Sequence, residues 1–158
     1  MALDVMRALT KTKGEALRIF RNRILSILRS ASTTQKTSSK ETPASDPNIT
    51  ATCQSIKSAI HNLIDFVSNN QSEVTVMEYA GRDFAISLAH IYIGALLLEQ
   101  AIATQNSSDS VVARNWTLTR DMCPVMTMQK FNMYRLQKGN DSYDLVFEGY
   151  VPQDTIVP

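Results

Sequence analysis

The stretch MEYAGRDFAISLAHIYIGALLLEQAI, residues 77–102, decides the fold because it is the longest apolar run in the chain. At 100° per residue, its apolar side chains fall on one stripe and on the opposite side as well. The stripe consists of Met77, Ala80, Phe84, Leu88, Ile91, Ala95, Leu98 and Ile102, and the opposite side of Ile86, Ile93 and Leu97. A helix that is apolar on both sides needs neighbours all round. The pattern predicts one central helix in an all-α bundle of about four helices.

The same stretch is too short to predict a membrane span. Its run without formal charge, residues 84–98, has 15 residues and includes His90 and Ser87, whereas a helix needs about 20 apolar residues to cross a bilayer. Gly94 lies inside this run, where glycine costs up to about 1 kcal/mol relative to alanine unless close approach of another helix offsets the cost. We therefore expect no membrane span and a close helix contact at Gly94.

The 158 residues have room for one domain of ordinary size, but the segments differ in character. We predict a basic amphipathic helical segment at residues 1–30, a flexible linker at 31–47, a helical bundle core at 48–138 and a short extended tail at 139–158. The linker contains no large apolar residue and is rich in Ser, Thr, Lys and Pro. A linker of this length is unusual inside a compact domain, which favours a separate packing unit for residues 1–30.

Start and stop signals place the individual helices. Lys13-Gly14 predicts a break inside the basic segment. A helix is expected from Asp46-Pro47 or Asn48 to about residue 68, with an inner stripe of Cys53, Ile56, Ile60, Leu63, Ile64 and Val67. Another is expected from residue 110 to about residue 122, capped by Asp109 or Ser108, with Val112, Trp116 and Thr119 on one face. Pro124 interrupts the pattern, and a further helix follows to about residue 137.

Charge is distributed unevenly although the net charge is only +1. Residues 1–40 contain nine Lys or Arg and two acidic residues, and the remainder contains seven basic and thirteen acidic residues. This polarity suits an acidic partner such as nucleic acid, contacted weakly by Arg18, Arg21 and Arg29. The alternative is that the basic part docks on the acidic part or on another domain. We favour this docking over nucleic-acid binding because the arginines do not form a single basic face.

Residues that could carry chemistry are few. Asp83, Ser87 and His90 share one side of the central helix, but a mid-helix serine offers neither the exposed, strained position nor the oxyanion hole of a nucleophilic triad. His61 and His90 are the only histidines, and we predict packing roles for both. Cys53 and Cys123 have no Cys or His partner at zinc-ligand spacing. Neither catalytic residues nor a metal site is predicted.

Three stretches together resemble the carboxyl-terminal region of acyl-CoA dehydrogenase-like flavoproteins of the AidB type. They are ALDVMRAL at 2–9, RDFAISLAHIYIGALLLEQA at 82–101 and RDMCPV at 120–125. In that family a leucine-rich LDVLR helix follows a Trp-Glu-Gly-Thr/Ser motif, whose glutamate holds the place of the catalytic base in true acyl-CoA dehydrogenases. The resemblance implies a C-terminal helical domain, or a fragment, of an FAD-dependent oxidoreductase. Its partners would be the remainder of that fold or a homo-oligomer.

The resemblance also implies that this chain alone neither binds FAD nor catalyses. The base-bearing motif would precede Met1, and the glycines are isolated, so no phosphate-binding loop is present. Glu148 lies in an Phe-Glu-Gly-Tyr sequence that lacks the following Thr/Ser, and we interpret it as an ordinary tail carboxylate. The alternative function is a free-standing helical interaction protein that binds nucleic acid weakly through its basic segment, because AidB-type proteins associate with DNA through this end.

The compartment is expected to be intracellular. The first 40 residues are rich in Arg and Ser, as in mitochondrial transit peptides, whereas Asp4 and Glu15 argue against such a peptide. Cytoplasmic and mitochondrial locations both stay open.

Overall fold

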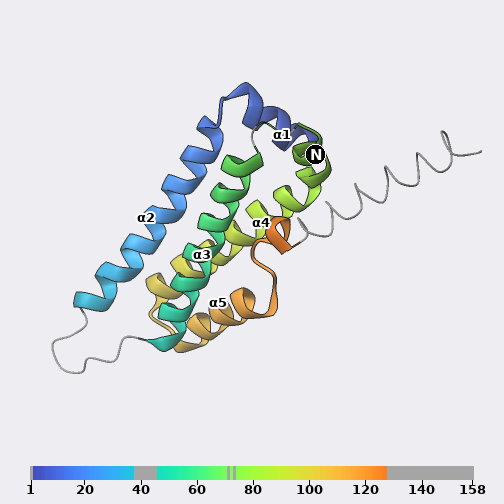
Figure 1. The fold of residues 1–158 in the computed structure, drawn as a ribbon. Coiled ribbons are helices and arrows are strands. Elements are labelled where there is room, and N and C mark those ends of the chain that lie inside the picture. Colours follow the sequence, from blue (N-terminus) through green and yellow to red (C-terminus); the bar gives the residue numbers. More distant parts are fainter. Residues whose placement is uncertain (1, 38–45, 71, 73, 128–158) are drawn as a thin grey trace, which may run out of the picture.

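The computed structural model describes residues 2–37, 46–70, 72 and 74–127, and this part of the chain contains helices and no strand (Figure 1). The helices are α1 Ala2–Lys11, α2 Glu15–Thr37, α3 Pro47–Asn70, α4 Val74–Thr104 and α5 Ser107–Thr119. Helix α4 contacts each of the other four helices. The predicted all-α class is therefore confirmed, with the central helix three residues longer at its start and two at its end.

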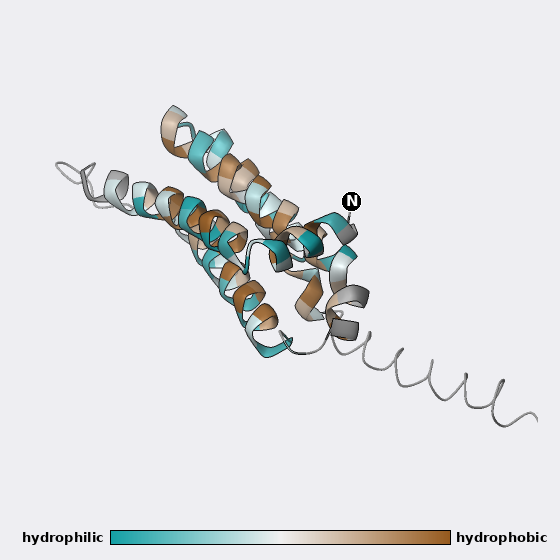
Figure 2. Ribbon diagram, turned by 90° about the horizontal axis from the view of Figure 1, so that it is seen from above, coloured by the Kyte–Doolittle hydropathy of each residue, from teal (hydrophilic) through white to brown (hydrophobic). Residues whose placement is uncertain are grey.

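The inward stripe of α4 forms the middle of one hydrophobic core. Phe84, Ile91, Ala95 and Leu98 are fully buried, as the 3.6-residue period predicts. From α3, the core takes Ile56, Ile60 and Leu63 together with Phe66, whose ring lies 6.4 Å from that of Phe84. Apolar turns recur along the helices throughout the bundle (Figure 2). Packing of these stripes, rather than intrinsic propensity, is what stabilises helices of this length.

Helix α2 belongs to the same core, which corrects the expectation of a separate packing unit. Ile24 and Ile27 are 0% and 1% exposed and lie in one cluster with the buried residues of α3 and α4. The predicted break before α2 is confirmed, because Lys13 and Gly14 have φ angles of 49° and 81°. Glycine adopts such a left-handed conformation without steric cost.

The predicted linker begins too early. Helix α2 runs to Thr37, and burial of Ala31 at 1% exposure holds this part of it against the core. The hydroxyl groups here are satisfied within the helix, because Ser32 Oγ donates to the Leu28 carbonyl and Thr33 Oγ1 to the Arg29 carbonyl. The rest of the predicted linker up to residue 45 lies outside the described residues. Helix α3 then begins with Pro47 at its first position.

Two helix caps are set by side chains before the helix starts. Asp46 Oδ1 accepts a hydrogen bond from the Asn48 amide at 2.8 Å, as one of the predicted start signals required. Asn106, and not Asp109 or Ser108, caps α5 by accepting from the Ser108 amide at 3.0 Å. The predicted cap was wrong because α5 begins at Ser107, which places Ser108 and Asp109 inside its first turn. The Asp109 Oδ2 accepts from Thr104 Oγ1 at 2.6 Å.

Of the three residues that the sequence places on one face of α5, only Trp116 packs against the core. The buried residues of this helix are Ser110, Ala113 and Thr117, whereas Val112 is 51% exposed and Thr119 is exposed. Small residues face inward because α5 packs closely against both α3 and α4. After α5, a helical turn at residues 124–127 begins at Pro124, while the remainder of the predicted helix, the turn at Lys138 and the extended tail with Glu148 lie outside the described residues.

Candidate functional site

The outward side of α4 carries an exposed apolar strip, which we define as Ala89, Tyr92, Ile93 and Leu96. All four residues are exposed, and the three large ones are 40%, 37% and 40% exposed. At 100° per residue they fall within one outward sector of the helix, opposite the buried stripe. The expectation of neighbours all round α4 is therefore wrong within the described residues: four helices cover its inward side and flanks, and this sector has no cover there.

The strip has a polar boundary on the side of α2. The Tyr92 ring lies 6.2 Å from the ring of Phe20. One turn further along α2, and two turns further along α4, Arg23 Nη2 lies 2.8 Å from Glu99 Oε2. This pair is about half exposed and contributes little to stability. Ile19, 60% exposed on α2 beside Phe20, extends the exposed apolar surface beyond the strip.

On the other flank of α4, a buried serine joins α4 to the segment after α5. Ser87 Oγ donates to the Asp83 carbonyl at 2.7 Å and accepts from the Val125 amide at 3.2 Å. Ser87 and Val125 are both fully buried, so the serine satisfies a backbone donor that has no helical partner. Its hydroxyl therefore has a structural role.

His90 and Trp116 form the next contact along this flank. The His90 Nδ1 lies 2.8 Å from the Asp121 carbonyl and therefore donates to it, and Trp116 Nε1 donates to the His90 carbonyl at 3.3 Å. The Arg120 guanidinium lies 3.7 Å from the centre of the Trp116 ring, close enough for a cation–π contact. These contacts hold α5 and the chain after it against α4.

The three residues of the rejected triad thus have separate partners. Ser87 bonds the backbone of Asp83 and not its carboxylate, and His90 turns to Asp121. His90 has the packing role that the sequence predicts. His61 does not, because its side chain is 75% exposed on α3, where its Nε2 lies 3.2 Å from Asp65 Oδ2. Among the described residues, no three His, Cys, Asp or Glu side chains could together hold a metal ion.

Burial sets the chemistry of the two cysteines, which are both free thiols. Cys123 is 5% exposed, and burial raises its pKa to about 11, while a hydrogen bond with Ser87 lowers it in part. Burial also raises the pKa of the Cys53 thiol. A thiol with a raised pKa is a poor nucleophile at neutral pH, which fits a packing role for both.

We expect the raised Cys123 pKa to make stability fall in alkaline solution. The unfolded thiol ionises near its ordinary value of 9.0 and the folded thiol near 11, so this contribution is complete below pH 9 and is lost as the pH rises to 11. The loss should be about 2 kcal/mol at pH 10.5 and about 3 kcal/mol at most. Urea denaturation at pH 8 and 10.5 should show a smaller drop for Cys123→Ala than for the natural chain, and equal drops would contradict the assignment.

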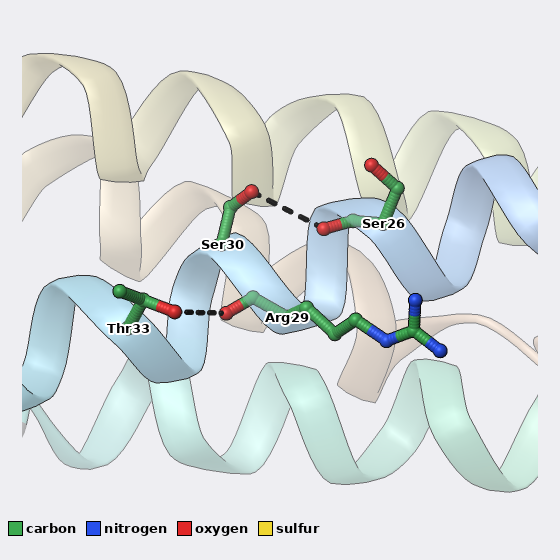
Figure 3. A pocket seen from close by; sticks show the side chains of 4 residues that line it. All are labelled: Ser26, Arg29, Ser30 and Thr33. Atoms are coloured by element: carbon green, nitrogen blue, oxygen red, sulfur yellow. Dashed lines mark hydrogen bonds between the residues drawn. The ribbon is translucent and has the colours of Figure 1, made fainter.

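A shallow hollow on α2 involves one of the predicted nucleic-acid contacts. Figure 3 shows its lining residues Ser26, Arg29, Ser30 and Thr33 on successive turns of the helix, with the Ser30 and Thr33 hydroxyls bonded to carbonyls of α2. Because all four come from a single helix, the hollow has no second wall of functional groups among the described residues.

The predicted arginine contacts are not assembled into one site. Arg18 Nε donates to Glu15 Oε2 at 2.7 Å, and this bond lowers the pKa of the Glu15 carboxyl. Arg18 and Arg29 are eleven residues apart, or about 16 Å along the helix. Arg21 is exposed on the same helix. Nucleic-acid contact by these residues stays a prediction.

The described residues do not fit an FAD. A flavin diphosphate needs convergent donors such as a glycine-rich turn at a helix N-terminus. At the N-termini of α3 and α5 the side chains of Asp46 and Asn106 take up amide donors, and the Asp46 carboxylate repels a phosphate. The hollow on α2 supplies one guanidinium. We therefore derive no flavin chemistry from this part of the chain.

By length and composition alone, one helical segment among the described residues, Ala80–Thr104 in α4, could cross a membrane. Core helices of soluble proteins share these properties, and the inward stripe of this segment is buried in the bundle. The absence of a membrane span stays a prediction.

The α4 strip is the candidate interaction surface that the sequence did not identify. Its signal was present, because Ile93 was recognised opposite the main stripe, but periodicity does not tell a covered side from an uncovered one. In a comparison with known protein families, a family model described as acyl-CoA dehydrogenase 11 C-terminal domain-like matches residues 15–147. Neither the curated proteins nor the solved structures gave a significant match.

Proposed function

Because the chain belongs to the acyl-CoA dehydrogenase 11 C-terminal domain-like family, we propose that it is the C-terminal helical domain of an FAD-dependent acyl-CoA dehydrogenase-like oxidoreductase and serves its assembly. The family match covers α2 through α5, the helices that contribute most of the core. The resemblance of the sequence to the carboxyl-terminal region of acyl-CoA dehydrogenase-like flavoproteins supports the same assignment.

The observation that carries the assembly role is the α4 strip. A closed hydrophobic core already exists without it, so Tyr92, Ile93 and Leu96 are not needed outside to complete the bundle. Exposed apolar residues that lie together on a protein surface mark interaction sites more often than scattered ones do. The side chains with catalytic potential, in contrast, are used for packing, as Ser87 and His90 show.

Co-expression with the other domains of an acyl-CoA dehydrogenase-like protein of this family tests the proposal. We expect the chain to co-elute with those domains as a flavin-containing complex, because the flavin and the catalytic base would come from them. The chain by itself should retain no FAD and should not reduce a dye in the presence of acyl-CoA.

Two outcomes would contradict this function. Flavin-loaded, acyl-CoA-oxidising protein obtained from the chain alone would make it an enzyme in its own right. If the chain and the other domains did not co-elute, although circular dichroism showed that both were folded, the assembly role would be removed. Glu148→Gln serves as a control, since a tail carboxylate should leave both the flavin content and the dye reduction unchanged.

A further inference from the structure

We propose that the α4 strip is occupied by the strip of a second copy of this chain, with the two α4 helices antiparallel across a two-fold axis near Tyr92 and Ile93. The inference rests on the proposed assembly function and names the partner of that surface. In such an isologous contact each residue of one copy faces a defined residue of the other. If Tyr92 faces Ile93 of the second copy, Ala89 faces Leu96 and Ala85 faces Gln100.

The sizes of the strip residues suit this pairing. Ala89 is small and Leu96 is large, and both are exposed on the same side of α4. The antiparallel register sets each leucine against the alanine of the other copy, so large and small side chains interdigitate. The axes of the two helices can then approach to about 8–10 Å, which is the usual distance for packed helix pairs. A parallel arrangement in register would instead set leucine against leucine and alanine against alanine.

The charges at the two ends of the strip suit it as well. Arg82 is exposed at the N-terminal end, and Glu99 lies at the C-terminal end with its carboxylate about half exposed. Between them the outward positions carry no formal charge, from Ala85 to Leu96. The antiparallel register sets Arg82 of each copy opposite Ala103 of the other, about one helical turn beyond Glu99, so Arg82 can join the half-exposed ion pair that Glu99 forms with Arg23. Opposite charges then meet at both ends, and the helix dipoles are opposed.

The strip forms the centre of the contact and not its full extent. A stable interface buries about 800 Å² on each partner, more than four side chains on one helix provide. The flanking surface supplies the remainder, including Ile19, which is 60% exposed on α2. Association is therefore expected to be concentration-dependent, with the apolar centre deciding whether it occurs.

Sedimentation of matched leucine variants tests the proposal. Leu96→Asp places two carboxylates in the apolar centre and should weaken dimerisation at least about tenfold. Leu118→Asp is the control, because Leu118 is an exposed leucine on α5, 58% exposed and outside the strip. It should leave the dimer intact. Both variants should keep the circular dichroism spectrum of the natural chain, since neither leucine is in the buried core. The melting temperature should fall in Leu96→Asp alone, because only that variant loses the stabilisation that dimerisation gives the folded chain.

Disulfide cross-linking tests the register. A mixture of an Ala85→Cys chain and a Gln100→Cys chain should form a covalent dimer, because the paired positions come within disulfide reach, while each variant alone should form much less. Cross-linking of Ala85→Cys with itself would indicate a parallel pair and overturn the register. The natural chain is the control for cross-linking through its own cysteines, of which Cys53 is half-buried and Cys123 is buried.

The outcomes separate this inference from the assembly function. A chain that is monomeric by sedimentation, yet co-elutes with the other domains of the fold through a contact that Leu96→Asp breaks, would keep the function and overturn the second copy as occupant. Binding of the monomer to phosphatidylcholine vesicles, lost in Leu96→Asp, would overturn it in favour of a lipid surface. A monomer that binds neither the domains nor vesicles would remove both proposals.

Discussion

Replacing Ile24 by alanine is expected to destabilise the whole bundle by about 2–5 kcal/mol, the range for deleting a buried isoleucine side chain. Ile24 is 0% exposed and lies in the cluster that also contains Ile60 and Phe84. The removed atoms leave a cavity at the junction of α2 with α3 and α4. Loss of stability should therefore be felt in all three helices together.

Urea denaturation, followed by circular dichroism and by Trp116 fluorescence, checks this expectation. The two signals should change together in one transition that shifts to lower urea. Ile19→Ala is the matched control on the same helix, because Ile19 is 60% exposed, and its effect should stay within about 0.5 kcal/mol. If α2 instead melted in a separate, earlier transition while Trp116 fluorescence was retained, the basic segment would be an independent unit.

Where a helix has a single apolar stripe, its burial could be predicted from the sequence. Ile56, Ile60 and Leu63 of α3 and Ile24 of α2 are buried as the 3.6-residue period requires. The helix break at Lys13-Gly14 could also be predicted from the sequence, because it depends on the local backbone conformation that glycine allows. Local signals of this kind do not depend on which elements pack together.

The sequence could not predict which of two faces a helix buries when both are plausible. In α5 the sequence places Val112 and Trp116 on one face, but only Trp116 packs against the core, and close packing with α3 and α4 buries the small residues Ser110, Ala113 and Thr117. Polar composition likewise ended α2 too early, because it does not register the burial of Ala31 against the core. Both errors concern tertiary contacts.

In the candidate site, too, local signals could be predicted from the sequence and tertiary contacts could not. The residues with recognisable chemistry, Ser87 and His90, proved to be backbone-bonding residues that hold α4 to the segment after α5. The surface with a functional role in our proposal consists of ordinary apolar residues. Its meaning arises only from exposure on a helix whose other sides are buried, and exposure is a property of the assembled bundle.

Replacing Gly94 by leucine is expected to cost about 3 kcal/mol, through overpacking of a close contact. A Cβ at this position would lie 2.9 Å from Met122 Cε and 3.4 Å from Thr117 Cγ2, and leucine adds three more carbons in the same direction. Leucine is among the best helix formers. The loss, measured by urea denaturation, would therefore report the contact between α4 and the residues that pack on it.

Two further variants separate packing from the effect of glycine on helix stability. Gly94→Ala should lie within about 1 kcal/mol of the natural chain, because the gain in helix propensity offsets a small shift of the flexible Met122 tip. In the double variant Gly94→Leu/Met122→Ala, the new side chain can enter the space that Met122 vacates. Its cost should therefore be at least about 1 kcal/mol less than the sum of the single costs. Strict additivity would show that Met122 does not form the contact at Gly94.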